Sequence, residues 1–309
     1  MSEETNNPAH GSVQVAHESR FNAAHFSEPL TAFSAGWRDP ENLAELLEFV
    51  APAVPVSRRF EFKKADNAQA FLSETDDIRA IGSAFKRVEY AGTSVNEKTL
   101  NKGLTLRVDH DEILNDDWRE RYVQILIQRL YRNELRRAVA AVDQVASNTQ
   151  CEWNNAKNPD ADLRKTLLRA ANKSGIRPNR LLLGETAWDL RANAYEENEN
   201  SRSAEMAPSD LARKLLVDDV RVMRARYQAN TNDKAHIVGN TVYAYFAQEG
   251  ATKDEPSNIK RFLTPCEGNG SFRVYLEEHT KYTDLTVEHY SNIVVTSEIG
   301  IQKITIINK

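Results

Sequence analysis

The stretch NDDWRERYVQILIQRLYRNELRRAVAAVDQVASNT, residues 115–149, decides the fold of this chain. Its apolar residues recur mostly at steps of three and four positions, which is the spacing of one helical face. They are Trp118, Tyr122, Ile125, Leu126, Leu130, Tyr131, Leu135, Ala138, Val139, Val142 and Val145. Because each residue adds about 1.5 Å of rise, the pattern predicts one helix of about 50 Å. That is longer than a small compact domain is wide, so we expect the helix to span something.

The residues far upstream of this helix predict an arm. Residues 1–12 are polar and are expected to lack order, and the scattered apolar residues of 13–37 suit an extended arm. A short amphipathic helix is expected over 40–49, where Pro52 and Pro55 follow.

The residues directly upstream of the helix predict β-structure. An extended segment is expected over 54–63. Strands over 85–93 and 98–109, joined by turn-forming residues at 92–97, predict a hairpin whose faces are both fairly polar. Such a ribbon is marginally stable alone, so we expect it to need a partner surface.

Beyond the long helix the chain predicts short helices and a return to strands. The helices are expected over 162–173, 185–193 and 209–216. Strands are expected where β-branched and aromatic residues alternate, at 180–183, 220–227, 237–247, 272–276, 283–295 and 299–307. The fold class predicted is α+β.

The composition of the 309-residue chain limits the classes of function. Forty basic and 45 acidic residues give a formal net charge of -5, and the mean hydropathy is -0.59. A dedicated DNA-binding module normally carries a basic excess, so that class is disfavoured. Cys151 and Cys266 form no C-x-x-C pair and are expected to be reduced thiols. We expect no signal peptide, because residues 1–12 are acidic and polar and contain no apolar run. We expect no membrane span, because no apolar run approaches about 18 residues.

No pattern in the chain predicts a catalytic residue, a cofactor or a metal. The phosphate-binding patterns G-x-x-x-x-G-K-[ST] and G-x-G-x-x-G are both absent. The run Asp109-His110-Asp111-Glu112 cannot converge on one ion if it is extended, because successive side chains alternate. His279 and His289 are expected on separate strands with no carboxylate at ligand spacing, and we interpret them as core or interface histidines.

The basic residues concentrate on the predicted long helix. Six arginines lie there, interleaved with Glu120 and Glu134: Arg119, Arg121, Arg129, Arg132, Arg136 and Arg137. Glutamates three or four positions away would pair with arginines on a solvated face, and that is the interpretation we favour together with ion pairs between subunits. Weak contact with a polyanion stays open.

Three stretches carry a resemblance to a known family. Residues 97–112, EKTLNKGLTLRVDHDE, are similar to an extended loop returning into a long spine helix. Residues 177–184, RPNRLLLG, followed by Trp188, are similar to the entry to an axial domain. Residues 290–295 and 304–307, YSNIVV and ITII, resemble the last strands of a peripheral domain. In the order of its elements the chain resembles the major capsid proteins of tailed phages, which have the Hong Kong 97-type fold.

The resemblance implies four parts of one capsid subunit. They are an N-terminal arm (1–55), an extended β-hairpin loop (56–110), a peripheral domain with the spine helix (111–174 and 269–309) and an axial domain (175–268). The implied function is assembly through pentamers and hexamers into an icosahedral shell around double-stranded DNA. The implied location is the virion, assembled in the cytoplasm of a bacterial host.

The resemblance also implies partners and contact residues. The main partner is the protein itself, with separate scaffold and portal proteins, and neither sequence-specific DNA binding nor a membrane is expected. The residues expected at subunit contacts are Lys98, Lys102, Arg107, Arg129, Arg132, Arg136 and Arg137.

Two other functions stay open. An encapsulin-like compartment would use the same fold to store a cargo enzyme, although such shells usually begin with an N-terminal helix rather than an arm. A cytosolic α/β enzyme would need a convergent polar site, which the sequence does not indicate.

Overall fold

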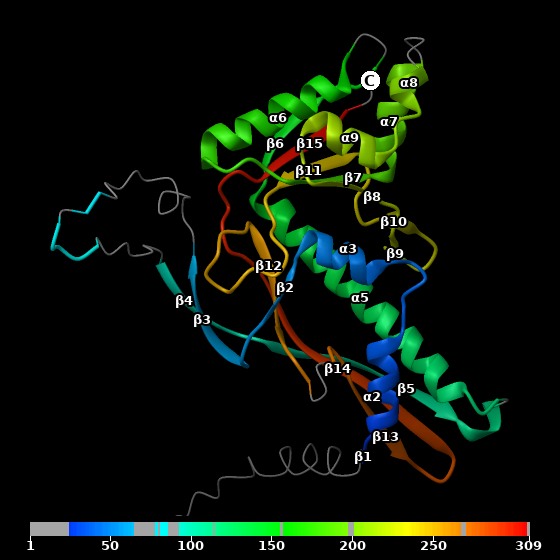
Figure 1. Ribbon diagram of the computed structural model, residues 1–309. Helices are drawn as coiled ribbons and strands as arrows, with labels where there is room; N and C mark the ends of the chain where they lie inside the picture. The colour runs from blue at the N-terminus through cyan, green and yellow to red at the C-terminus, as the bar shows by residue number, and fades with distance from the viewer. Residues whose placement is uncertain are drawn as a thin grey trace, which may run out of the picture. The chain divides into compact units, whose positions relative to one another are not determined.

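A computed structural model of the chain describes residues 25–64, 78–79, 81–85, 93–113, 115–154, 157–196, 201–266 and 270–307 (Figure 1). The expectation for residues 1–12 lies outside this part. The described residues belong to two compact units. Unit 1 draws on Met1–Trp37, Asn101–Leu130 and Pro265–Tyr290, and unit 2 on Arg38–Leu100, Tyr131–Thr264 and Ser291–Lys309.

The long helix α5 runs from Trp118 to Val145 and contributes residues to both units. Its 28 residues correspond to about 42 Å. The prediction of one long helix is confirmed, but its ends at 115 and 149 were wrong. Strand β6 (Ser147–Cys151) follows at once, because these residues pair in parallel with the distant strand β15 (Gln302–Ile306). A long-range ladder decides the end of the helix.

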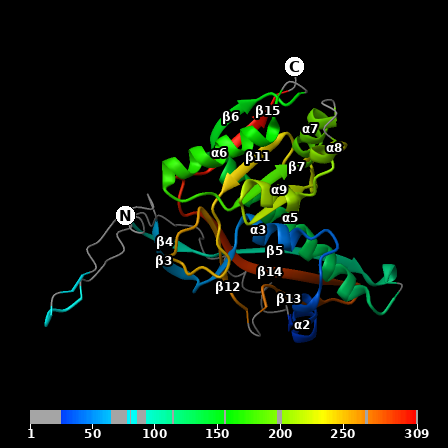
Figure 2. The ribbon, with the colours of Figure 1, turned by 45° about the horizontal axis from the view of Figure 1, so that its top comes forward.

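Unit 2 is built on a five-stranded sheet in the order β6-β15-β11-β7-β8 (Figure 2). The three further strands are β7 (Arg180–Gly184), β8 (Asp219–Met223) and β11 (Thr241–Tyr245). β7 and β8 are parallel, as are β15 and β6, whereas β11 is antiparallel to both of its neighbours. The strand predicted over 180–183 is confirmed, and those predicted over 237–247 and 299–307 are confirmed with shorter ends. The strand predicted over 220–227 is divided into β8 and a separate strand, β9 (Arg226–Gln228).

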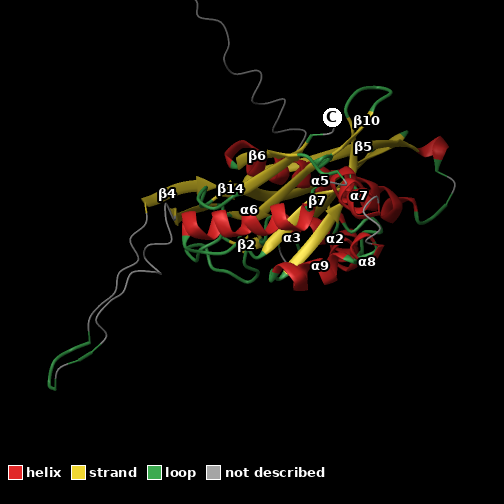
Figure 3. Cartoon of the chain, turned by 90° about the horizontal axis from the view of Figure 1, so that it is seen from above, coloured by secondary structure: helices red, strands yellow, loops and turns green. Residues whose placement is uncertain are grey.

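Helices cover both faces of this sheet (Figure 3). Leu181 and Leu183 of β7 face a core formed with α6 (Pro159–Ser174), α7 (Glu185–Glu196) and α9 (Pro208–Leu215). Leu182, between them, faces the opposite core with α3 (Leu43–Val50) and the unit 2 part of α5. Because successive strand residues point to opposite faces, a run of three leucines serves both cores.

The remaining strands of unit 2 correct one expectation. β4 (Thr93–Lys98) is a strand where a turn was predicted, and its antiparallel partner is β3 (Arg59–Lys64). The segment 86–92, expected to hold much of the first hairpin strand, lies outside the described residues. Val95 packs beside the aromatic group of Phe60, Phe62 and Phe262, which gives this polar ribbon one apolar contact.

Unit 2 is completed by short elements. β2 (Ala53–Pro55) pairs in parallel with β12 (Ile259–Thr264), and β9 (Arg226–Gln228) forms a hairpin with β10 (Lys234–His236). The short helix α8 (Ser201–Ala204) lies between the predicted helices over 185–193 and 209–216, where no helix was predicted.

Unit 1 is an antiparallel arrangement around β14 (Tyr282–Val295), whose last residues belong to unit 2. β13 (Arg273–Glu278) pairs with β14 and with β1 (His25–Phe26), and β5 (Leu100–Asp109) also pairs with β14. At Gly103 of β5 a Cβ atom would lie 2.9 Å from the carbonyl oxygen of Val287, so a glycine permits this close approach.

Two local elements of unit 1 differ from expectation. Helix α2 (Glu28–Gly36) replaces part of the arm predicted as extended, with a proline in its first turn. Its Thr31 hydroxyl accepts a hydrogen bond from the Val274 amide of β13 at 3.1 Å. His110–Glu112 form a turn of 3-10 helix, labelled η1, rather than extended chain. No helix of the described residues is both long enough and apolar enough to cross a membrane.

Candidate subunit-contact surfaces

Arg107, predicted at a subunit contact, is engaged within its own unit. Its guanidinium donates two hydrogen bonds to Asp284 of β14, Nε to Oδ1 and Nη2 to Oδ2, both at 2.8 Å. The same guanidinium lies 3.8 Å from the ring centroid of Tyr282. The hydrogen bonds from Arg107 lower the pKa of Asp284 below its ordinary value. Arg107 therefore fastens β5 to β14 while its side chain stays 61% exposed.

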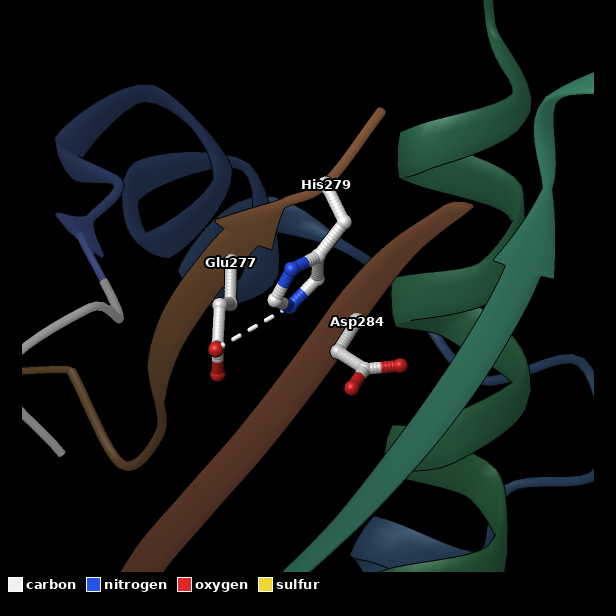
Figure 4. A group of neighbouring side chains, drawn as sticks. All are labelled: Glu277, His279 and Asp284. Carbon is white, nitrogen blue, oxygen red and sulfur yellow. Dashed lines mark ion pairs between the residues drawn. The ribbon is translucent and has the colours of Figure 1, made fainter. Parts of the chain in front are cut away.

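Asp284 also belongs, with Glu277 and His279, to a group of described residues that could hold a cation (Figure 4). One ligand atom each of Glu277, His279 and Asp284 lies within 4.8 Å of the others. The expectation that His279 has no carboxylate near it was wrong. Glu277 and Asp284 are opposite each other in the β13–β14 register, which sequence spacing does not reveal. These side chains already contact protein partners, because His279 Nε2 lies 3.0 Å from Glu277 and Arg107 donates a hydrogen bond to Asp284.

His289 fits the interpretation made for it. It is 2% exposed, and its ring lies 5.2 Å from that of Phe272 at an interplanar angle of 32°. It is a core histidine.

Arg132 and Arg137 on α5 form ion pairs within the chain. Arg132 Nη2 lies 2.5 Å from Glu41, and Arg137 Nη1 lies 2.6 Å from Glu134. Glu134 is 1% exposed and its other oxygen accepts a hydrogen bond from the Ser291 hydroxyl at 2.7 Å. The interpretation as a charge paired with a glutamate of the same helix is confirmed for Arg137, whereas the partner of Arg132 is Glu41, outside the helix.

Lys98, Lys102 and Arg129 occupy three different settings. Lys98 is exposed at the end of β4, and its carbonyl oxygen accepts a hydrogen bond from Asn292 at 3.1 Å. Lys102 is half-buried on β5. Arg129 is exposed on α5, and in the described part of the chain it pairs with no carboxylate. In the described part of the chain, the side chains of Lys98 and Arg129 form no ion pair and can meet another molecule.

Arg136 and Arg137 meet at a groove in unit 2, which we call the basic groove. It has a volume of about 690 Å³. Its polar and charged lining comes from α5, the β9–β10 hairpin, β11 and β15: Asn133, Arg136, Arg137, Asp143, Tyr227, Asn240, Thr241, Tyr243 and Lys303. The other five contact candidates do not line it.

The charges of the basic groove are only partly balanced. Lys303 and the Tyr243 hydroxyl both donate to Asp143 at 2.5 Å. Burial opposes the ionisation of Asp143, but these hydrogen bonds outweigh it and lower its pKa. Arg136 instead lies 3.8 Å from the ring centroid of Tyr227, and among the described residues it meets no carboxylate. An uncompensated cation therefore remains in the groove.

Sequence reasoning found the two arginines of the groove and missed the rest of its charged lining. Asp143 lies on α5 and Lys303 on β15, and the two residues are 160 positions apart in the sequence. Nothing in the local pattern around Lys303 marks it, because it is one polar residue among the alternating residues of a strand. The antiparallel pairing of β15 with β11, in which Lys303 is opposite Tyr243, brings it to the groove.

Comparisons with known proteins place the fold. No protein-family model matches the chain, and no curated protein matches it. Among solved structures, a phage-related protein from Bordetella bronchiseptica RB50 is similar over 92% of this chain and 97% of its own, with a TM-score of 0.68 and 17% identity. The SrpI encapsulin complex from Synechococcus elongatus PCC 7942 is similar over 86% and 87%, with a TM-score of 0.51 and 11% identity.

At such identities the likeness speaks for the fold and not for the function. It covers nearly the whole of this chain and of both solved structures. The α+β fold that the sequence predicted, the Hong Kong 97-type fold, is confirmed at the level of the whole chain.

Proposed function

We propose that this protein is the major capsid protein of a tailed phage or prophage. In this proposal it assembles through pentamers and hexamers into an icosahedral shell around double-stranded DNA. The observation that carries the proposal is the likeness to the Bordetella phage-related protein over 92% of this chain and 97% of that one. Because the likeness extends over nearly the whole of both chains, it supports a whole subunit with the same fold rather than one domain in common.

The polar groups of the described residues support an architectural role rather than catalysis. Several charged side chains form ion pairs with one another: Arg107 with Asp284, Lys303 with Asp143, and Arg191 with the buried Asp160. Groups that already neutralise each other are poorly placed to act on a substrate. Exposed charges such as Arg129 and Arg136 are instead free to meet another subunit. Many modest contacts, repeated by closed symmetry, are sufficient to hold a shell together.

The finer assignments are part of the same proposal. Residues 1–55 are the arm, 56–110 the extended loop, 111–174 with 269–309 the peripheral domain, and 175–268 the axial domain. The shell is completed by separate scaffold and portal proteins, in a virion assembled in the bacterial cytoplasm.

The test is expression of the full chain alone, and with a scaffold protein, followed by light scattering on a sizing column and negative-stain electron microscopy. Hollow shells or tubes are the expected result. A monodisperse monomer or dimer under both conditions contradicts the proposal and favours the enzyme alternative.

An encapsulin-like shell is the second candidate, because the SrpI encapsulin shares the fold at a TM-score of 0.51. The contents of purified particles separate the two. A single co-purifying enzyme inside a shell of fixed size favours an encapsulin, whereas nucleic acid or dependence on a DNA-packaging motor favours a phage capsid.

A further inference from the structure

The connection between β5 and α5 carries a cluster of carboxylates, which we call the acidic turn: Asp109, Asp111, Glu112, Asp116 and Asp117. All five residues are exposed. Asp109 has a local role, because its Oδ1 accepts a hydrogen bond from the Asp111 amide at 3.0 Å. In the described part of the chain none of the five forms an ion pair. The turn therefore presents negative charge that its own unit does not neutralise.

The basic groove has the opposite imbalance. Three cations line it, Arg136, Arg137 and Lys303, against the single carboxylate of Asp143. Asp143 is used by Lys303, and Arg137 is used by Glu134 through one of its nitrogens. Arg136 keeps its full charge, with its guanidinium held in place on the face of Tyr227. A positioned, unneutralised guanidinium in a groove is a site for a carboxylate, with which it can form two parallel hydrogen bonds.

We propose that the basic groove receives the acidic turn of a second copy of this chain, with Arg136 as the central contact. The inference rests on the proposed function, since it names a contact through which subunits would assemble. Two different surfaces meet in such a contact, so each copy offers a groove to one neighbour and a turn to another. Head-to-tail contacts of this kind close into rings when the rotation between copies allows it.

The charges favour a protein carboxylate over nucleic acid as the occupant. Binding along a phosphate backbone draws its affinity from many lysine and arginine contacts. Among the described residues the groove has one cation without a carboxylate partner, and the chain as a whole carries a net charge of -5. A short turn with several carboxylates fits a single guanidinium better than a long polyanion does.

The experiment reverses the charge on each side and then on both. Arg136→Glu changes an exposed side chain whose contact is the Tyr227 ring, so the fold is expected to persist. Asp111→Lys with Glu112→Lys reverses the charge of two of the five acidic residues of the turn and leaves the hydrogen-bonding Asp109 intact. We expect each to raise the protein concentration needed for assembly about fivefold or more, and the combined variant to restore most of the loss. Raising NaCl should weaken wild-type assembly in the same way, because exposed charges are screened.

Arg164→Glu is the matched control, because Arg164 is an exposed helix arginine outside the groove. It should assemble as the wild type does. The proposal is overturned if the two one-sided reversals assemble normally, or if the combined variant is no better than either. It is also overturned if Arg136→Glu lowers only the amount of co-purifying nucleic acid.

Failure of the proposed function looks different. If the wild type forms no particles at all, the capsid assignment is contradicted, and sedimentation of the subunit still decides the contact. Salt-sensitive self-association that Arg136→Glu removes supports the groove, whereas identical sedimentation of the two proteins rejects it.

Discussion

Arg107 on β5 and Asp284 on β14 are joined by two parallel hydrogen bonds of 2.8 Å, the geometry in which a guanidinium and a carboxylate fit best. The pair connects two strands whose residue numbers differ by 177. Because its carboxylate has a lowered pKa, it also links the stability of unit 1 to pH.

Replacing Asp284 with Asn should lower the melting temperature at neutral pH and flatten the acid limb of the stability curve. A carboxyl whose pKa is lowered on folding adds stability above its unfolded pKa of about 3.9. That stability is lost as the pH falls through the folded-state pKa. Melting curves of wild type and Asp284→Asn from pH 7 to 2 should therefore converge below about pH 3.9. A constant difference across the range would mean that the pair does not control the effect.

Removing the carboxylate of Asp160 should be among the most damaging single changes in unit 2. Asp160 is 1% exposed and pairs with Arg191, which is fully buried, at 2.7 Å, and with Lys214 at 2.7 Å. Asp160→Ala would leave the Arg191 charge buried without its partner, at a cost of about 3–5 kcal/mol. Urea denaturation measures it. Asp162→Ala is the control, because its 3.9 Å pair with Lys165 lies at the surface and should contribute less than about 1 kcal/mol.

Gly184→Ala should destabilise unit 2 although it adds a single methyl group. A Cβ atom there would lie 1.9 Å from the carbonyl oxygen of Gly239, which accepts a hydrogen bond from the Ala187 amide at 3.2 Å. Backbone must move, and we expect a loss of at least about 3 kcal/mol by denaturant titration. Gly36→Ala, at a helical position with no atom within 4 Å of the new Cβ, should instead be neutral or stabilise by about 0.5 kcal/mol.

Lys260 should make the protein more stable in mildly alkaline solution. Burial lowers the pKa of its ammonium to about 8, although it donates to the carbonyl oxygens of Thr252, Lys253 and Glu255. An unfolded lysine titrates near about 10.4, so the unfolded state binds more protons between these values and stability rises with pH. Between pH 8 and about 10.4, the free energy of unfolding of the wild type should rise by roughly 1–3 kcal/mol relative to that of Lys260→Met. Parallel curves for the two proteins would contradict the lowered pKa.

The fold was predictable where local periodicity matches the final packing. The steps of three and four around Leu126, Leu135 and Val142 gave α5, and all three residues are buried. Its C-terminal end was not predictable, because Ser147–Cys151 leave the helix only to pair with β15. The same holds for Thr93–Lys98, whose turn-forming residues become a strand once Arg59–Lys64 lies beside them.

The charged sites show the same limit. Arg136 and Arg137 could be named from the sequence because they are adjacent on a helix. Lys303 and Asp143 could not, since their ion pair joins a strand and a helix that are 160 positions apart. The three-residue group of Glu277, His279 and Asp284 depends on the register of one hairpin, which the sequence does not fix by itself.

The position of β15 has a consequence for the order in which unit 2 can fold. β15 lies between β6 and β11, yet the ribosome makes it after every other strand of that sheet. Until Gln302–Ile306 emerge, β6 has no partner strand in the described sheet and β11 has one open edge. Pairing that must wait for distant residues slows folding. A nascent chain stalled before Gln302 should therefore show fast amide exchange in β6. The sheet should be complete only when β15 has paired with both β6 and β11.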